Sequence, residues 1–182
     1  MLVYAAIASL DGYVNDVHGG FEWAAPDEQL HQYVNDLERS STTYLYGRRM
    51  YEIMRVWETM PTDDEPPVVA DFARLWRAAD KVVHSTTLTS VDTPRTRIAR
   101  DLDPDRVRRL VEESEGDVSI GGPTLAGQAL ALGLVDEVHL FLHPVIVGGG
   151  TSALPDDVRV DLSLLDEHRF DSGVVHLHYR VG

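Results

Sequence analysis

The segment from Asp117 to Leu125 constrains the fold more than any other part of this sequence. Its β-branched run, Val118 to Ile120, is typical of a short strand and ends in the pair Gly121-Gly122. Pro123 and a helix-forming run, residues 124–132, follow at once, and proline is well tolerated in the first turn of a helix. The segment therefore predicts a strand, a glycine turn and a helix whose first N–H groups suit a phosphate.

Two further predicted strands end in groups that suit a phosphate. The strand at residues 42–46 is followed by Gly47-Arg48-Arg49, and the strand at residues 81–84 is followed by Ser85-Thr86-Thr87. An arginine fork pairs with phosphate through two hydrogen bonds, and hydroxyls after a strand suit a ribose 2′-phosphate. Each of these patterns alone is common in turns and on surfaces, but together they predict an NADP(H) site. No G-x-G-x-x-G follows the first strand, so a standard Rossmann site is not expected.

Strands and helices alternate along most of the chain. Residues 2–9 are nearly all apolar, which predicts a central strand buried on both faces. The end of the chain is rich in strands, at residues 135–142, 160–165 and 174–179, and the last of these is expected to be antiparallel. The pattern predicts one α/β domain over residues 1–182, with a mostly parallel central sheet, helices on both faces and antiparallel C-terminal strands.

Composition excludes several classes of function. The net charge of −14 argues against binding to nucleic acid or to anionic membranes, because both require basic surfaces. Cysteine is absent, which excludes disulfides and zinc–cysteine sites and permits a cytoplasmic location. The N-terminal run lacks the basic region of a signal peptide, and no apolar run approaches the ~20 residues of a membrane span. We therefore expect a cytoplasmic protein that binds a small molecule.

Five motifs follow one another in order along nearly the whole chain. They are Ala8-Ser-Leu-Asp-Gly12, Gly47-Arg-Arg-Met-Tyr-Glu52, Lys81-Val-Val-His-Ser-Thr-Thr-Leu88, Ile120-Gly-Gly-Pro-Thr-Leu125 and the stretch from Gly133 to Gly150. Each is a weak signal alone. Together they resemble the dihydrofolate reductase-like superfamily, and most closely the stand-alone relatives of the reductase domain found at the C-terminus of the riboflavin-biosynthesis deaminase–reductase.

The resemblance implies a three-layer dihydrofolate reductase-like fold and a reductase that uses NADPH. Hydride would pass from NADPH to a C=N or C=O group of a pteridine-like, pyrimidine-like or ribosyl substrate, such as 5-amino-6-(5-phosphoribosylamino)uracil. The resemblance also implies a homodimer formed through the C-terminal strands, since dimers are common among the riboflavin-type relatives.

Matching the motifs residue by residue implies a set of cofactor contacts. Arg48 and Arg49 would hold the adenosine-side phosphates, with Ser85 and Thr86 near the 2′-phosphate. The pyrophosphate would be held by the backbone N–H groups of Gly121, Gly122, Pro123 and Thr124. The remaining expected contacts are Gly47, Met50 and Leu125, with Val14 and Thr151 near the nicotinamide half. Met50 departs from the family pattern, because a threonine is common there and its hydroxyl could cap the helix and contact phosphate.

The proton donor is expected near the start of the first helix. Trp23-Ala-Ala-Pro26 has the spacing of the Trp-x-x-Pro segment of dihydrofolate reductases, and counting forward reaches Glu28, with Asp27 beside it. A carboxyl in an apolar pocket has a raised pKa and can hold a proton near neutrality. Alternatively, both carboxylates simply favour the helix N-terminus. Ala8, Asp11 and Trp23 are expected near the substrate, although Asp11 before a glycine is also typical of a turn.

Two alternative functions share this fold. A classical dihydrofolate reductase needs a cation for the glutamate tail of folate, but Arg55, Arg74 and Arg77 are not in register with the folate-binding arginine. The acidic loop at residues 63–65 would also repel an anionic substrate if it lay near the pocket mouth. The second alternative is a non-catalytic NADP(H)-binding protein that has kept the fold and lost the acid.

A histidine metal protein is a third alternative. His139 and His143 lie on one face of a predicted strand, and His176 and His178 do so on another. If the two strands pair, the four imidazoles could cluster, and metal sites need three or four such ligands. A solvated or subunit-interface sheet face is the more usual explanation of such a pattern, so no metal is expected.

Overall fold

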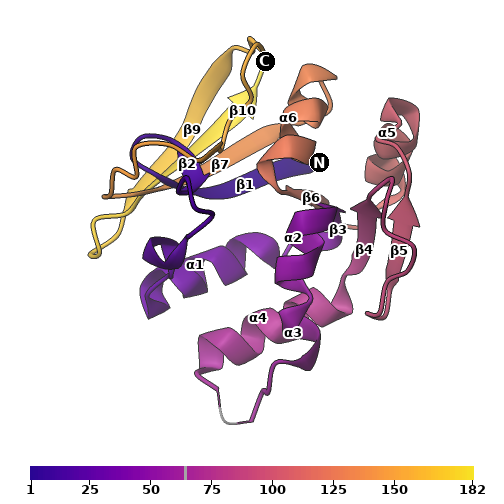
Figure 1. The fold of residues 1–182 in the computed structure, drawn as a ribbon, viewed down its shortest axis with the longest axis horizontal. Helices are drawn as coiled ribbons and strands as arrows, with labels where there is room; N and C mark the ends of the chain where they lie inside the picture. Colours follow the sequence, from indigo (N-terminus) through magenta and orange to yellow (C-terminus); the bar gives the residue numbers. More distant parts are fainter. Residues whose placement is uncertain (64) are drawn as a thin grey trace.

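A computed structural model describes residues 1–63 and 65–182 and contains one large sheet of eight strands (Figure 1). These strands are β1 (Leu2–Ser9), β3 (Ser41–Gly47), β4 (Asp80–His84), β5 (Thr96–Ala99), β6 (Asp117–Gly121), β7 (Glu137–His143), β9 (Leu162–Arg169) and β10 (Val175–Val181). They lie in the order β5-β4-β3-β6-β1-β7-β10-β9. The two remaining strands, β2 (Tyr13–Asn15) and β8 (Thr151–Ser152), form a separate antiparallel ribbon.

The strand directions match the predicted architecture. All neighbours from β5 to β7 pair in parallel, whereas β10 is antiparallel to both β7 and β9. The predicted mostly parallel sheet with antiparallel C-terminal strands is therefore confirmed. Because parallel strands end at the same edge of a sheet, the segments that follow β1, β3, β4, β6 and β7 gather on one side of the molecule.

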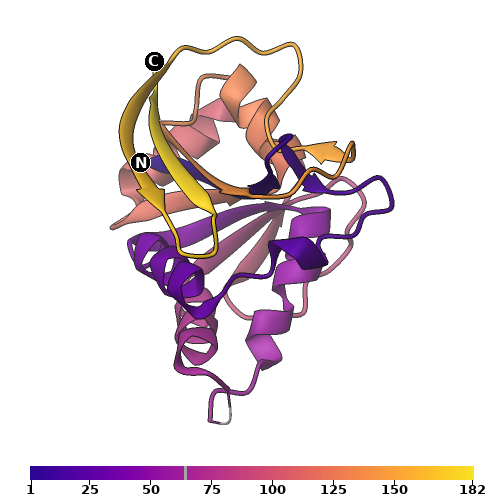
Figure 2. The ribbon, with the colours of Figure 1, turned by 90° about the vertical axis from the view of Figure 1, so that its left-hand side faces the viewer.

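Helices cover both faces of the sheet (Figures 1 and 2). Their bounds are η1 (Glu22–Ala24), α1 (Glu28–Glu38), α2 (Arg48–Met54), α3 (Val56–Thr59), α4 (Pro67–Ala78), α5 (Pro104–Glu113) and α6 (Pro123–Ala131). The helices α5 and α6 pack on one face, and α1, α2 and α4 pack on the other. Of the acidic loop at residues 63–65, Asp64 lies outside the described residues. Across the described chain, no helix combines the length and the apolar character that crossing a membrane requires.

Apolar packing on both faces explains why β1 is central. Tyr4 faces the cluster that includes Leu125 and Leu130 of α6, whereas Ile7 faces the cluster formed around Leu30 of α1. The prediction that this strand is buried on both faces is confirmed. Its carboxyl end, which leads to the β2–β8 ribbon, is thereby held in place by the core on either side.

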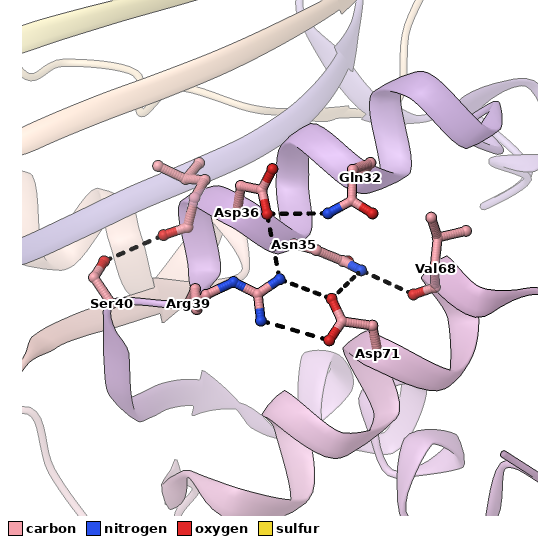
Figure 3. A network of polar contacts seen from close by, with 8 residues as sticks. Gln32, Asn35, Asp36, Arg39, Ser40, Val68 and Asp71 are labelled. Atoms are coloured by element: carbon pink, nitrogen blue, oxygen red, sulfur yellow. Dashed lines mark hydrogen bonds and ion pairs between the residues drawn. The ribbon is translucent and has the colours of Figure 1, made fainter.

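A polar network joins α1 to α4 (Figure 3). The buried amide of Asn35 donates to the carbonyl oxygen of Val68 at 2.8 Å and to Oδ2 of Asp71 at 3.1 Å. Arg39, on the surface, contacts the same carboxylate at 2.9 Å and lowers the pKa of Asp71. The network orients α1 over the sheet and therefore positions the start of this helix, where the acid is expected.

Candidate functional site

The three segments predicted to bind phosphate meet at the carboxyl edge of the sheet. In the strand register, Gly47 of β3 lies beside His84 of β4, and Tyr46 lies beside Gly121 of β6. The turn after β4 and the start of α2 also touch, because Arg48 Nη1 donates to Thr87 Oγ1 at 3.1 Å. Segments far apart in the sequence therefore form one continuous surface, as their positions after parallel strands predict.

The glycine pair allows α2 to pack closely against the turn before α6. A Cβ atom on Gly121 would lie 2.8 Å from the Tyr46 ring, and one on Gly122 would lie 3.3 Å from Cβ of Met50. Gly122 also has φ +94°, a conformation that residues with side chains rarely adopt. Both glycines are therefore needed for internal packing, and Met50 fills the space against them.

The first turn of α6 presents backbone N–H groups at this surface. Its N-cap residue is Gly122, so no side chain caps the helix. Pro123 occupies the first helical position and has no N–H, which corrects its predicted role as a backbone donor. Gly122, Thr124 and Leu125 supply the N–H groups of this turn, where the helix dipole favours an anion.

The two arginines at the start of α2 are in different states. Arg48 is bound to Glu52, with 2.7 Å between Nε and Oε1, in addition to its contact with Thr87. Arg49 is exposed and forms no ion pair with any described residue. Arg49 is therefore the cation that is available to a ligand, whereas Arg48 would have to exchange partners.

The turn after β4 uses its first hydroxyl internally. Ser85 is buried, and its Oγ accepts the N–H groups of Thr87 at 3.3 Å and Leu88 at 3.0 Å. Thr86 is exposed, and Thr87 rather than Thr86 contacts the neighbouring arginine. Thr87 is thus a site residue that the motif match does not select, although it belongs to the same Ser-Thr-Thr run.

The ribbon of β2 and β8 brings the two residues expected near the nicotinamide into one small sheet. Val14 lies in β2, and Thr151 of β8 pairs with Asn15, whose Oδ1 accepts the Thr151 N–H at 3.1 Å. The loop before β8 is held by Asp11, which accepts the N–H groups of residues 147 and 148 at 3.1 and 2.8 Å. A hydrogen bond from Ser9 and these backbone bonds lower the pKa of Asp11. Its carboxylate therefore anchors a loop, which is the turn role that Asp-Gly suggested.

A cleft of about 310 Å³ lies at the carboxyl end of β7. It is lined by Trp23, Ala25, Asp27, Leu30, His143, Pro144, Val145, Ser172 and Val174. Trp23 packs edge-on against His143, with ring centroids 5.9 Å apart. Their Nε1 and Nε2 atoms are buried and have no hydrogen-bond partner among the described residues. The cleft therefore combines apolar walls with two unpaired polar groups, as small-molecule sites do.

The predicted substrate and acid residues are placed differently around this cleft. Ala8 is fully buried and does not line it. Asp27 lines it, but as the N-cap of α1 its Oδ1 accepts the Leu30 N–H at 2.8 Å. Glu28 is exposed and lies outside the lining. Of the two candidate acids, the structure brings Asp27 to the cleft, and it also gives Asp27 the helix-terminus role that was the alternative.

His143 is the functional candidate that the sequence does not single out. The sequence pattern groups it with the other histidines, yet it lies at the opposite end of β7 from His139 and lines the cleft. Burial lowers the pKa of the His143 imidazole, so it is neutral at pH 7. Its position at the end of a parallel strand is the signal that could have found it. Ser172 and Val174 could not be found locally, because a distant loop carries them to the cleft.

A second cleft, of about 320 Å³, lies beside α2 and α3. Glu52, Glu58 and Asp92 line it, and Arg55, its one lining arginine, is paired with Asp92 at 3.1 Å. Carboxylates outnumber cations there, so this cleft does not suit the phosphates of a nucleotide.

Comparison with known proteins identifies the family. The model of the RibD C-terminal domain matches residues 1–176. The chain belongs to the RibD C-terminal domain family. Within curated proteins, YyaP of Bacillus subtilis (strain 168) is 29% identical over 176 residues, which cover 94% of this chain and 89% of YyaP. The riboflavin biosynthesis protein RibD of Mycobacterium tuberculosis is 35% identical over 69 residues, which cover 38% of this chain and 20% of that protein.

Solved structures share the fold of this RibD C-terminal domain at low sequence identity. A putative riboflavin biosynthesis protein from Shewanella sp. PV-4 has a TM-score of 0.78 and 17% identity, covering 100% of this chain and 98% of that one. A pyrimidine reductase-like protein from Corynebacterium diphtheriae has a TM-score of 0.70 and 16% identity, with 100% and 91% covered. The bifunctional deaminase/reductase of Thermotoga maritima has a TM-score of 0.71 and 16% identity, and the chain spans 56% of it. These likenesses confirm the expected fold.

Proposed function

We propose that this protein is an NADPH-dependent reductase that transfers hydride to a pyrimidine-like, pteridine-like or ribosyl substrate. The observation that carries the proposal is the meeting of three phosphate-type segments at one edge of the sheet of a RibD C-terminal domain. That edge also holds the cleft formed around Trp23 and His143. The RibD proteins and the pyrimidine reductase-like relative support a related substrate class. The proposal includes a cytoplasmic location, which the absence of cysteine permits.

The residues present fit a nucleotide cofactor. Arg49 is an exposed cation with no ion pair among the described residues, and Thr124 and Leu125 lie in a helix turn that no side chain caps. In the proposal these groups hold the phosphates, and Thr87 assists beside Arg48. The cofactor supplies the hydride, while the protein supplies binding, orientation and a proton.

The cleft at the end of β7 is the proposed substrate site. The Trp23 ring gives a flat apolar wall for a heterocycle, and the buried nitrogens of Trp23 and His143 offer it hydrogen bonds. Asp27 lines the same cleft and is the proposed proton donor, rather than Glu28. The walls also exclude water from the reacting atoms, which strengthens each of these polar interactions.

Only the reductase activity is proposed. The match to the RibD protein of Mycobacterium tuberculosis covers 20% of that protein, and the chain spans 56% of the Thermotoga maritima deaminase/reductase. The deaminase activity named for the latter therefore does not extend to this chain.

Calorimetry and turnover assays test the proposal in sequence. NADPH should bind with one site per chain, and Arg49→Gln should weaken binding by about tenfold, the loss of one charge-assisted phosphate contact of about 1.5 kcal/mol. Arg74→Gln, which removes an exposed arginine from α4, is the matched control. Absence of NADPH binding by the wild-type protein would overturn the cofactor assignment.

Substrate class is tested by following NADPH oxidation with a ribosylaminopyrimidine and with dihydrofolate. We expect turnover with the pyrimidine. Turnover with dihydrofolate alone would favour a classical dihydrofolate reductase. NADPH binding without turnover on any pterin, pyrimidine or small carbonyl compound would favour a non-catalytic NADP(H)-binding protein.

We also propose that the protein is a homodimer formed through β9. This strand is an edge of the large sheet, and all eight of its residues are exposed. Leu162, Leu164 and Leu165 are 39–53% exposed on it, and an exposed apolar edge strand favours association with another chain. Light scattering should give the mass of a dimer for the wild-type protein and that of a monomer for Leu164→Glu. A wild-type monomer would contradict the proposal.

A further inference from the structure

A group of imidazoles and a carboxylate lies on the α1 face of the sheet, at the opposite end of β7 from the substrate cleft. The antiparallel register of β7 and β10 places His178 directly across from His139, and Glu137 precedes His139 by two residues on the same face. One ligand atom from each of these three residues lies within 4.8 Å of the other two. Two neighbouring strands therefore bring two imidazoles and one carboxylate together at a position that the proposed reductase chemistry does not use.

This group is not the solvated sheet face that the sequence suggested. His139 is 4% exposed, and the side chains of Glu137 and His178 are 12% and 21% exposed. The pairing of the two strands clusters His139, His176 and His178, whereas His143 stands apart at the cleft. The group is therefore built into the molecule, and His178 retains access to solvent.

A chain of hydrogen bonds orients His139. Its Nδ1 lies 2.9 Å from Nε2 of His176, and Nδ1 of His176 lies 3.2 Å from the hydroxyl of Tyr33 on α1. If His139 donates along this chain, its Nε2 carries a lone pair directed away from His176. Metal-binding histidines are characteristically held in this way, with the second ring nitrogen bonded to another group.

Local charge favours a cation overall. Glu137 belongs to the group, and the carboxylates of Asp117 and Asp166 act on His139 and His176 respectively. Arg180 opposes them, with Nη2 4.0 Å from Oε1 of Glu137. Burial lowers the pKa of His139 to about 3. Its imidazole is thus neutral at pH 7, the form that binds metals.

We propose that Glu137, His139 and His178 form a binding site for a divalent transition metal such as Zn²⁺, with water at the fourth position. Two imidazoles and a carboxylate suit zinc and its neighbours, whereas Mg²⁺ and Ca²⁺ prefer oxygen ligands alone. The proposal is independent of the reductase function. The site joins β7 to β10 beneath α1, so bound metal stabilises the fold and takes no part in hydride transfer.

Metal binding requires a defined local change. The rings of His139 and His178 are stacked, with centroids 3.9 Å apart and planes 18° apart, and Nε2 of His178 lies 2.8 Å from Oε2 of Glu137. A metal binds in the plane of an imidazole, so the partly exposed His178 ring must turn out of the stack and release Glu137. Ligand atoms of a tetrahedral zinc ion lie about 3.4 Å apart, which the group reaches by moving about an ångström.

The test uses full-length protein without a histidine tag. Calorimetry with Zn²⁺ should give one site per chain, and Zn²⁺ should raise the melting temperature because it binds only the folded state. His178→Gln and Glu137→Gln should each weaken Zn²⁺ binding by at least about tenfold. His168→Gln is the matched control, because His168 is an exposed histidine on the adjacent β9 and lies outside the group; it should bind Zn²⁺ as the wild type does.

A second measurement keeps the proposal falsifiable if a variant fails to fold. Co²⁺ added to the wild-type protein should give the intense visible absorption of a tetrahedral nitrogen–oxygen site, and Zn²⁺ should abolish it. Absence of stoichiometric Zn²⁺ binding by the wild type would overturn the proposal. Binding that survives both His178→Gln and Glu137→Gln, or that is lost in His168→Gln, would overturn it as well.

Discussion

At the scale of single residues, Asp27 combines two roles that are usually separate. Its carboxylate caps α1 through the Leu30 N–H and also lines the substrate cleft beside Trp23. Capping requires only an oxygen acceptor, whereas proton donation requires a carboxyl group. Asparagine provides the first and lacks the second, so one substitution separates the roles.

We expect Asp27→Asn to retain the stability of the wild type and to lower kcat by about 100-fold or more, the usual contribution of a positioned acid. Asp27→Ala should in addition lower the free energy of unfolding by about 1 kcal/mol, because the cap is lost. Urea unfolding and NADPH oxidation measure the two effects. Glu28→Gln should change neither, and full activity of Asp27→Asn would remove Asp27 from the chemistry.

At the scale of elements, the contact between α1 and α4 depends on a buried amide more than on surface charge. Asn35 is fully buried and bonds to both Val68 and Asp71, whereas the side chain of Arg39 is 49% exposed. Removing the amide leaves the carbonyl of Val68 without its partner inside the protein. Removing Arg39 exposes Asp71 to water, which replaces the lost contact.

The comparison of two alanine variants follows from this difference. Asn35→Ala should lower the free energy of unfolding by roughly 1–3 kcal/mol, the cost of an unsatisfied buried polar group. Arg39→Ala should lower it by less than about 1 kcal/mol, as for exposed ion pairs. Urea denaturation at matched pH measures both, and equal losses would show that the ion pair contributes as much as the amide.

Elements differ in how well they can be predicted from sequence. The strands and helices of the large sheet carry enough alternation, apolar content or glycine punctuation to be recognised, as at residues 117–125. The ribbon of β2 and β8 and the four-residue α3 do not, because so few residues show no period. The same holds at the site. Gly47 and Gly121 are recognisable from their local sequence, whereas the hydroxyl bonds of Ser85 and the contact of Trp23 with His143 exist only after folding.

At the scale of the whole molecule, the interior contains a carboxyl group between α1 and the sheet. Glu38 is buried, Ser119 Oγ donates to its Oε1 at 3.2 Å, and its Oε2 has no partner among the described residues. Burial raises the pKa of Glu38, and hydroxyl hydrogen bonds offset only part of that effect. Because the folded state holds this proton more tightly, the unfolded state releases it first as pH rises. Stability is therefore lost as pH rises from the unfolded pKa through the folded pKa.

Glu38→Gln removes this pH dependence. At pH 8 the variant should be more stable than the wild type by roughly 1–3 kcal/mol, and the difference should shrink below about pH 4, where the carboxyl is protonated in both states. Thermal unfolding across this pH range measures it. Glu28→Gln, on the exposed start of the same helix, should show no such difference. A stabilisation that does not vary with pH would contradict ionisation of the buried carboxyl as its cause.

The central position of β1 has a consequence for how the chain acquires its structure. Residues 2–9 form the first strand, yet both of its neighbours, β6 and β7, come from residues 117–143. A ribosome releases the chain from its N-terminus, so β1 emerges long before any strand it pairs with. Closing such a long loop is entropically costly, and topologies dominated by distant contacts fold slowly. Until residue 143 has emerged, an apolar strand remains without its full set of partners, which makes this interval the one in which the nascent chain depends most on chaperones.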